Sequence, residues 1–282
     1  MKLARYGDRG RELPGIIDPD GQLRSIAGHV QDLAGATLDP RSLAEIADLD
    51  PAALPVVEEG TRIGPCVGAV GKIVCIGLNY SDHVKESGME VPDEPVLFMK
   101  ATSSISGPYD DVVLPRGTPK GDWEIELGVV IGTAAKYVTV DEARSHIAGY
   151  CIVNDVSDRA AQFDGTGQWV KGKSADTFAP IGPWLVSADE IPDPNNLDMW
   201  LEIDGHRYQD ANTKTMIFGV YELVAYVSRF MTLVSGDIIS TGTPPGVALG
   251  FDPQPWLEPG NVMRLAISGL GVQEQRVVAA NS

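Results

Sequence analysis

The chain has 282 residues, of which 43% are hydrophobic, and it carries a formal net charge of −17. That length allows one large domain, or one domain with a small appendage. The negative charge disfavours nucleic acid and anionic membranes as partners, and no segment reaches the roughly 18 apolar residues of a membrane span. The N-terminus has no apolar stretch typical of a signal peptide, and the three cysteines form no CxxC pair. We therefore expect a cytoplasmic protein without nucleic-acid or membrane partners.

The first 70 residues differ in composition from the rest. Asp39 and Pro40 predict the start of a short helix, because Asp can cap its first turn and Pro suits its first position. Residues 50–71 are rich in Pro, Gly and Glu and are typical of a linker. We expect a small N-terminal domain and linker over residues 1–70, followed by the main domain over residues 71–282.

The main domain is predicted to be rich in strands and poor in helices. Two helices are indicated, one beginning at Thr139 with a capping box to Glu142, and one over 220–231 with a single apolar stripe. Because the strands do not alternate regularly with helices, a TIM barrel or Rossmann sheet is disfavoured and a β-dominated α+β domain is predicted. The predicted strands are 73–77, 96–99, 112–114, 124–131, 150–154, 184–186, 200–203, 206–209, 237–241 and 262–267.

Three carboxylates occur at the ends of two predicted strands. Glu124 and Glu126 are two residues apart, so in a strand their side chains point to the same face. Asp155 ends the next apolar run. Three oxygen ligands of this kind suit Mg²⁺ or Mn²⁺. The alternative is a surface pair of glutamates and an unrelated turn aspartate.

His83 and Glu86 lie in the segment that follows the first strand of the main domain. In a helix they would share a face, and the carboxylate would raise the basicity of the imidazole, as a general base for water requires. An ordinary surface pair is the alternative. Because Gly88 can end this short helix and apolar anchors are few, we expect the segment to be a mobile lid.

Other polar residues group around the same segments. Arg159 and Gln162 would share a helical face near Asp155, and Arg suits a ligand carboxylate. Lys173, in a segment predicted to be a loop, could neutralise an oxyanion, and Thr243 could donate a hydrogen bond to a ligand. Solvated charges and a structural Pro-Pro turn are the alternatives.

Six segments in this order resemble the fumarylacetoacetate hydrolase family, specifically its short bacterial branch. They cover most of the chain from about residue 72 to residue 271, and they are GLNYSDHVKE, PVLFMK, DWEIELGVVIG, YCIVNDVSDRAAQ, GKSADTFAPIGP and STGTPPGV. The resemblance implies a rolled, mixed β-sheet catalytic domain over residues 71–282. It also implies a homodimer, one Mg²⁺ or Mn²⁺ per subunit and no organic cofactor.

The resemblance also assigns roles to individual residues. One departure is Ala160, where many members carry Asp after the Arg. The implied metal ligands are Glu124, Glu126 and Asp155, the implied catalytic residues are His83, Glu86 and Lys173, and the implied substrate-binding residues are Lys100, Arg159, Gln162 and Thr243.

The implied activity is hydrolytic C–C cleavage of a 2,4-dioxo acid to pyruvate and a second carboxylic acid. The substrate is expected to be a small anionic 2-oxo acid, an acylpyruvate or a diketo-deoxy sugar acid such as L-2,4-diketo-3-deoxyrhamnonate. Oxaloacetate decarboxylase is the first alternative, followed by fumarylpyruvate hydrolase and ureidoglycolate lyase. A catalytically silent binding protein on the same fold is the alternative from another class.

Overall fold

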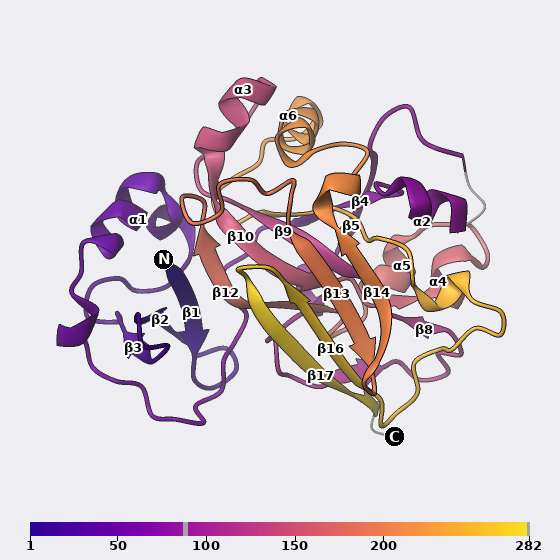
Figure 1. The fold of residues 1–282 in the computed structure, drawn as a ribbon, viewed down its shortest axis with the longest axis horizontal. Coiled ribbons are helices and arrows are strands. Elements are labelled where there is room, and N and C mark those ends of the chain that lie inside the picture. Colours follow the sequence, from indigo (N-terminus) through magenta and orange to yellow (C-terminus); the bar gives the residue numbers. More distant parts are fainter. Residues whose placement is uncertain (87–89, 281–282) are drawn as a thin grey trace.

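The computed structural model describes residues 1–86 and 90–280, without the side chains of residues 83–85. The helices are α1 (Pro40–Ala47), α2 (Ser81–Glu86), α3 (Val140–Ala143), α4 (Arg159–Phe163), α5 (Val170–Lys173) and α6 (Val220–Phe230) (Figure 1). The strands are β1 (Lys2–Tyr6), β2 (Leu13–Ile17), β3 (Leu23–Ser25), β4 (Ile73–Gly77), β5 (Val96–Lys100), β6 (Ile105–Ser106), β7 (Val112–Leu114), β8 (Gly121–Asp122), β9 (Ile125–Ile131), β10 (Ile147–Asn154), β11 (Ser157–Asp158), β12 (Ala179–Ser187), β13 (Asp198–Ile203), β14 (His206–Asn212), β15 (Ile238–Ser240), β16 (Val262–Ile267) and β17 (Gly271–Ala279).

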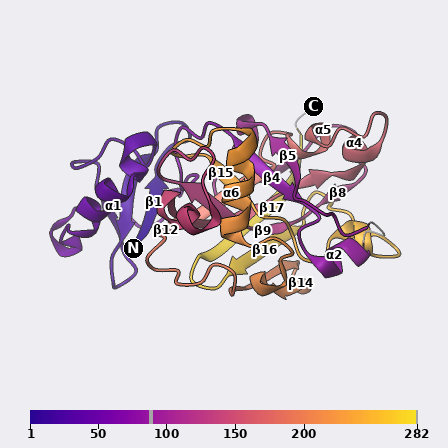
Figure 2. The same ribbon diagram turned by 90° about the horizontal axis from the view of Figure 1, so that it is seen from above.

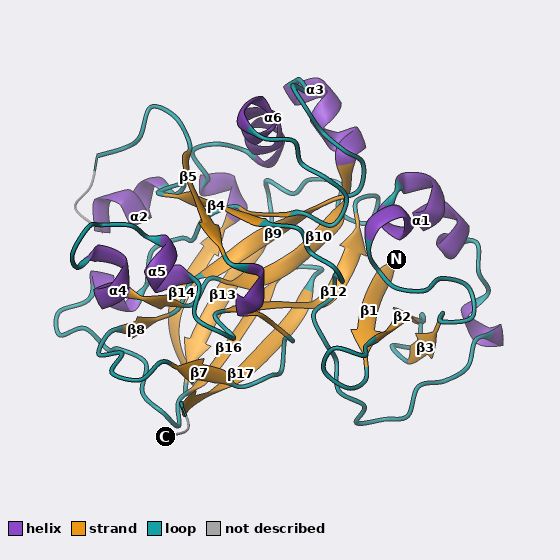
Figure 3. Cartoon of the chain, turned by 180° about the vertical axis from the view of Figure 1, so that it is seen from behind, coloured by secondary structure: helices purple, strands orange, loops and turns teal. Residues whose placement is uncertain are grey.

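The larger of the two main sheets has ten strands and crosses the whole molecule (Figure 3). Its order is β3-β2-β1-β12-β10-β9-β15-β4-β5, with β6 paired to β12 beside this path. β15 runs parallel to β4, whereas β9 is antiparallel to both of its neighbours, β10 and β15. The sheet is therefore mixed, as predicted, and β9 lies near its middle.

A second sheet of five strands, in the order β14-β13-β16-β17-β7, packs against the first. Alternate residues of β9, from Ile125 to Ile131, belong to the core that also contains Met199 of β13 and Leu265 of β16. On the opposite face of β9, Val130 belongs to a second core shared with the N-terminal region. Because both faces of β9 are covered, the strand is apolar throughout apart from Glu126.

Most predicted elements of the main domain are confirmed. The bounds of β4, β7 and β16 match the prediction, and the helix caps predicted at Asp39 and at Thr139 with Glu142 are present. The prediction of a loop around Lys173 was wrong, because residues 170–173 form α5. The strands that were not predicted are β1–β3, β6, β8, β11 and β17.

The N-terminal strands extend the large sheet through the antiparallel pairing of β1 with β12. Figure 2 shows this region at one end of the molecule and α2, α4 and α5 at the other. The domain boundary near residue 70 stays a prediction, as does the homodimer. Within the described ranges, we find no helix that combines the length and the apolarity needed to span a bilayer.

A half-buried ion-pair cluster joins the N-terminal region to the loop before β7. Arg62 donates to both carboxylate oxygens of Asp110, at 2.8 and 2.6 Å, and to Glu12 at 3.0 Å. Burial opposes ionisation of Asp110, but the Arg62 guanidinium and the Gly107 N–H outweigh it, so the pKa of Asp110 is lowered. The pKa of Glu12 is also lowered, because its backbone hydrogen bonds and Arg62 outweigh burial.

These lowered pKa values predict how stability depends on pH. A carboxylate whose folded pKa lies below its unfolded pKa stabilises the fold above the unfolded value, and this stability is lost as the pH falls through the folded value. Asp110→Asn should therefore lower the unfolding free energy at pH 7 by about 1–3 kcal/mol, and the difference from wild type should shrink below about pH 4. Urea denaturation across this range measures it, with the exposed neighbour Asp111→Asn as control. A difference that persists at low pH would contradict the charge-based explanation.

Candidate active site and metal centre

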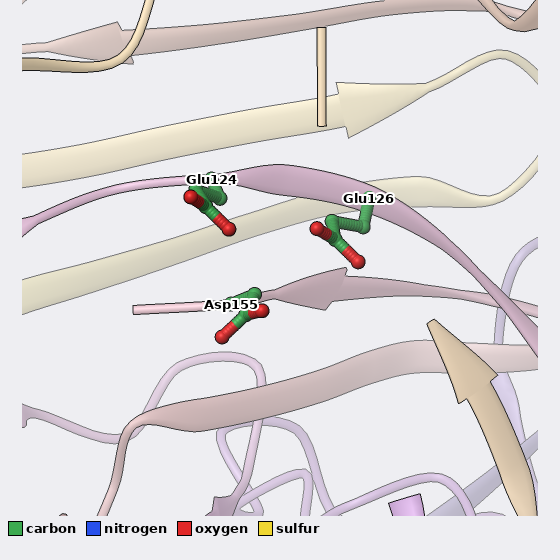
Figure 4. A group of neighbouring side chains, drawn as sticks. All are labelled: Glu124, Glu126 and Asp155. Carbon is green, nitrogen blue, oxygen red and sulfur yellow. The ribbon is translucent and has the colours of Figure 1, made fainter. Parts of the chain in front are cut away.

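Three buried carboxylates meet where β9 begins and β10 ends. Glu124 immediately precedes β9 and Glu126 lies within it, so both point to one face, toward Asp155 after β10 (Figure 4). The backbone N–H of Asp155 donates to the Glu124 carbonyl at 2.8 Å, which fixes the register of the two segments. One oxygen of each carboxylate lies within 4.8 Å of the others. The structure thus brings together the three predicted metal ligands.

Three buried cations surround these carboxylates. Lys173 lies 2.7 Å from Glu124 and 3.1 Å from Asp155, and Lys100 lies 2.5 Å from the other oxygen of Asp155. Arg159 contacts Glu124 at 2.5 Å and a fourth carboxylate, Asp122, at 2.8 Å. Four carboxylates therefore face three cations, and this buried cluster keeps an excess of negative charge.

Glu126 is the carboxylate that the cations neutralise least. Its Oε2 accepts hydrogen bonds from the Ser240 hydroxyl at 2.5 Å and the Gly242 N–H at 3.0 Å. Within the described part of the chain, its Oε1 accepts none. Burial, and then the charges of Asp155 and Glu124, raise the pKa of Glu126 well above its usual range. A bound cation would remove this penalty, because opposite charge favours the ionised form.

The donor set fits a hard divalent cation. Three carboxylates offer oxygen ligands, the surroundings carry excess negative charge, and one glutamate oxygen is uncompensated. Mg²⁺ and Mn²⁺ are the cations that prefer such ligands, with positions left for water or substrate. Glu124, Glu126 and Asp155 would hold the ion.

The acidic cluster borders a cavity of about 40 Å³. Glu124, Glu126, Arg159, Gln162, Lys173 and Thr243 line it. Burial opposes protonation of Lys173, but Asp155 and Glu124 outweigh it, so the pKa of Lys173 is raised and the side chain stays an ammonium. Its position suits the predicted role of balancing negative charge on a bound molecule.

The predicted substrate-binding residues have partners within the protein. The Arg159 guanidinium donates to Gln162 at 3.0 Å in addition to its two carboxylates. Lys100 is not among the residues that line the cavity, and it donates to Asp155 and the Val156 carbonyl. Thr243 donates to the Ile125 carbonyl at 3.0 Å. Their direct contact with substrate stays a prediction, whereas Arg159 and Lys100 are observed to contact the acidic groups.

The two residues of the predicted water-activating dyad lie on α2. The side chain of His83 falls outside the described residues, as does Gly88, so their arrangement is not described. The Glu86 carboxylate accepts the Gly246 N–H at 3.0 and 3.2 Å. A Cβ at Gly250 would lie 2.3 Å from the Glu86 carboxyl carbon. This close approach docks α2 on the turn at residues 246–250.

Asp122 is a site residue that the sequence reasoning missed. It accepts from Arg159 at 2.8 Å and from the backbone N–H groups of Ala248 and Leu249 at 2.7 and 3.1 Å. β8 places it there through the pairing of Asp122 with Ser157, just before Arg159. A signal was present, because Asp122 precedes Glu124 at the same two-residue spacing that joins Glu124 to Glu126.

Comparison with known proteins establishes the family. The family model described as fumarylacetoacetate (FAA) hydrolase C-terminal matches residues 72–278. A relative from Burkholderia multivorans, whose name proposes a hydrolase and specifies no substrate, is 58% identical over 283 residues, covering 99% of this chain and 100% of its own. The chain belongs to the fumarylacetoacetate hydrolase family.

Two solved structures are similar over their full length. The fumarylacetoacetate hydrolase from Exiguobacterium antarcticum is 34% identical with a TM-score of 0.87, covering 99% of this chain and 100% of its own. The maleylpyruvate hydrolase from Sphingobium sp. SYK-6, solved with a manganese(II) ion and pyruvate, is 27% identical with a TM-score of 0.83, covering 100% of both chains. The family and the fold class predicted from the sequence are thereby confirmed.

Removing one carboxylate should remove the metal. Glu126→Gln keeps the size of the side chain and can still accept from Ser240, but it supplies no charge. By isothermal titration calorimetry, we expect the wild type to bind one Mn²⁺ per chain and Glu126→Gln to show no measurable binding. Glu45→Gln, at an exposed position of α1, is the control and should bind as wild type does. Undiminished binding by Glu126→Gln would contradict the assignment.

Asp122 should act on the metal site through Arg159. In Asp122→Asn, the guanidinium loses one anionic partner and competes more strongly for Glu124. Loss of a residue that orients a metal ligand typically lowers affinity about 10- to 100-fold, and we expect a fall of that size in Mn²⁺ affinity. Calorimetry on the folded variant, verified by circular dichroism, measures it. A destabilised variant with unchanged Mn²⁺ affinity would show that Asp122 is only structural.

Proposed function

We propose that the protein is a divalent-metal-dependent hydrolase that cleaves the C–C bond of a 2,4-dioxo acid. The products are pyruvate and a second carboxylic acid. The observation that carries the proposal is the buried triad of Glu124, Glu126 and Asp155 with Lys173 between two of its members, bordering a cavity. The manganese and pyruvate in the related maleylpyruvate hydrolase support it.

The reaction balances with water as the only co-substrate. Water adds to the carbonyl at C4, the bond between C3 and C4 breaks, and its electron pair goes to C3. The resulting pyruvate enolate is protonated at C3, and C4 becomes the new carboxylic acid. A divalent ion, when bound, supplies positive charge next to the 2-oxo acid head.

The residues of the chain have separate tasks in this scheme. Lys173, kept protonated by the neighbouring carboxylates, balances negative charge as the enolate forms. Arg159 holds Glu124 in place. His83, on α2, takes the proton from the attacking water, in the role that the family resemblance implies. Glu86 anchors α2 against the 246–250 turn.

Oxaloacetate decarboxylation is the competing activity, because it forms the same enolate from the same head group but needs no attacking water. His83→Ala should lower acetylpyruvate hydrolysis by about 10²- to 10⁴-fold, the usual contribution of a general base. Any oxaloacetate decarboxylation should fall much less. Pyruvate release with Mg²⁺ or Mn²⁺ measures both rates.

The exposed His29→Ala is the matched control and should leave both rates unchanged. Equal losses on both substrates in His83→Ala would remove His83 from water activation. A wild-type protein that releases pyruvate only from oxaloacetate would replace the hydrolase with the decarboxylase. No pyruvate from either substrate would favour the binding protein.

A further inference from the structure

The cavity is lined by apolar side chains as well as by the polar residues described above. The apolar lining residues, here called the apolar wall, are Ile76, Leu78, Phe98, Phe163, Trp169 and Leu249. These six residues come from segments far apart in the sequence, namely the end of β4, β5, α4, the start of α5 and the 246–250 turn.

Three aromatic rings form the centre of the apolar wall. The ring centroids of Phe98 and Trp169 lie 5.3 Å apart at 64°, and those of Phe163 and Trp169 lie 6.2 Å apart at 79°. Edge-to-face contacts of this kind are the favoured aromatic geometry. A Cβ at Gly77 would lie 2.6 Å from the Trp169 ring, so the indole rests directly on the β4 backbone. The wall is therefore held in place by packing on a strand.

The apolar wall lies next to the charged residues of the site. The Lys173 ammonium lies 5.2 Å from the centroid of the Phe98 ring, so one side chain faces both the carboxylates and the wall. On the other side, Asp122 holds both Arg159 and the backbone of Leu249. A molecule whose head lies on the carboxylates would therefore have apolar side chains next to it.

Leu78 contributes to the wall at a conformational cost. Its φ of 58° lies in the left-handed region, which is unfavourable for a bulky side chain. The neighbouring Asn79 side chain holds the turn by bonding Phe218 and the Thr241 carbonyl. Glycine or asparagine would adopt this conformation with less strain. We interpret the leucine at this position as a source of apolar surface for the cavity lining.

The cations near the cavity form ion pairs with its buried carboxylates. Arg159, Lys173 and Lys100 each bond carboxylates of the metal site. Among the lining side chains that the structure describes, none on the apolar wall carries a charge. A carboxylate or a chain of hydroxyls placed against this wall would lose its hydration without gaining partners, which is unfavourable.

We infer that the acyl group of the substrate, beyond C4, is apolar, either aromatic or branched aliphatic, and is recognised by Trp169, Phe98 and Phe163. This inference rests on the proposed function, since it concerns the tail of the same 2,4-dioxo acid. It separates this chain from enzymes whose substrates carry a second carboxylate or a sugar-like tail.

Four acylpyruvates with one head and different tails test the inference. Acetylpyruvate has the minimal tail, benzoylpyruvate an aromatic one, succinylpyruvate a carboxylated one and glyceroylpyruvate a hydroxylated one. An apolar pocket typically discriminates by about 10- to 200-fold per group. We expect kcat/KM for benzoylpyruvate to exceed that for acetylpyruvate by at least about tenfold, with the two polar tails below acetylpyruvate.

Variants of the wall link this preference to its residues. In Trp169→Ala, the ratio of kcat/KM for benzoylpyruvate to that for acetylpyruvate should fall about tenfold. Phe163→Arg, at a half-exposed position that tolerates a charge, should raise the ratio of succinylpyruvate to benzoylpyruvate. Phe230→Ala removes an exposed aromatic ring on α6, outside the cavity, and should leave all ratios unchanged.

Binding without turnover gives a second readout. Phenylpyruvate lacks the second carbonyl and cannot be cleaved, and by calorimetry it should bind more tightly than pyruvate in wild type but not in Trp169→Ala. Faster cleavage of succinylpyruvate or glyceroylpyruvate than of benzoylpyruvate would overturn the inference and leave the proposed function intact. Absence of hydrolysis for all four substrates, with preferential phenylpyruvate binding retained, would overturn the proposed function instead.

Discussion

Excess negative charge buried beside the central strand is the constraint around which the rest of this structure is arranged. Glu124, Glu126, Asp155 and Asp122 lie out of water, and among the described side chains three cations, Lys100, Arg159 and Lys173, balance them. Desolvated charges of one sign destabilise a fold unless partners or a bound ion compensate them. The raised pKa of Glu126 shows that the protein alone leaves this compensation incomplete. Binding of a divalent ion, as proposed above, would therefore stabilise the fold, because the same three carboxylates are unfavourable without a cation and favourable with one.

Single side chains connect the buried carboxylates to the segments that line the cavity. Asp122 holds Arg159 and the turn that carries Leu249, and Glu86 ties α2 to the same turn. The register between β9 and β10 sets the distance from Glu126 to Asp155. A shift of one residue in β9 would turn both Glu124 and Glu126 to the opposite face, away from Asp155. The ten-stranded sheet therefore acts as the scaffold that keeps the acidic oxygens together.

Sequence reasoning succeeded where one local pattern decides the structure. The two-residue spacing of Glu124 and Glu126 fixed their common face, and the caps at Asp39 and Thr139 marked their helices. It failed for β17 because Gln273 and Gln275 occupy inward positions where apolar residues would signal a strand. Their amides instead bond backbone carbonyls of Ile152, Gly182 and Pro108. The small strands β1–β3 are short and flanked by turn residues, and their place in the sheet depends on β12, far along the chain.

The polar and apolar lining residues of the cavity differ in the same way. Glu124, Glu126 and Asp155 stand at short spacings around β9 and β10, so the acidic side of the site is visible in short motifs. The tail side depends on Leu78, Phe98, Phe163, Trp169 and Leu249, which no motif unites and which meet only in the folded chain. Apolar residues at these positions are indistinguishable in sequence from ordinary core residues. The apolar surface available to a substrate is therefore visible in the packing around Trp169 of the folded chain and not in the acidic motifs.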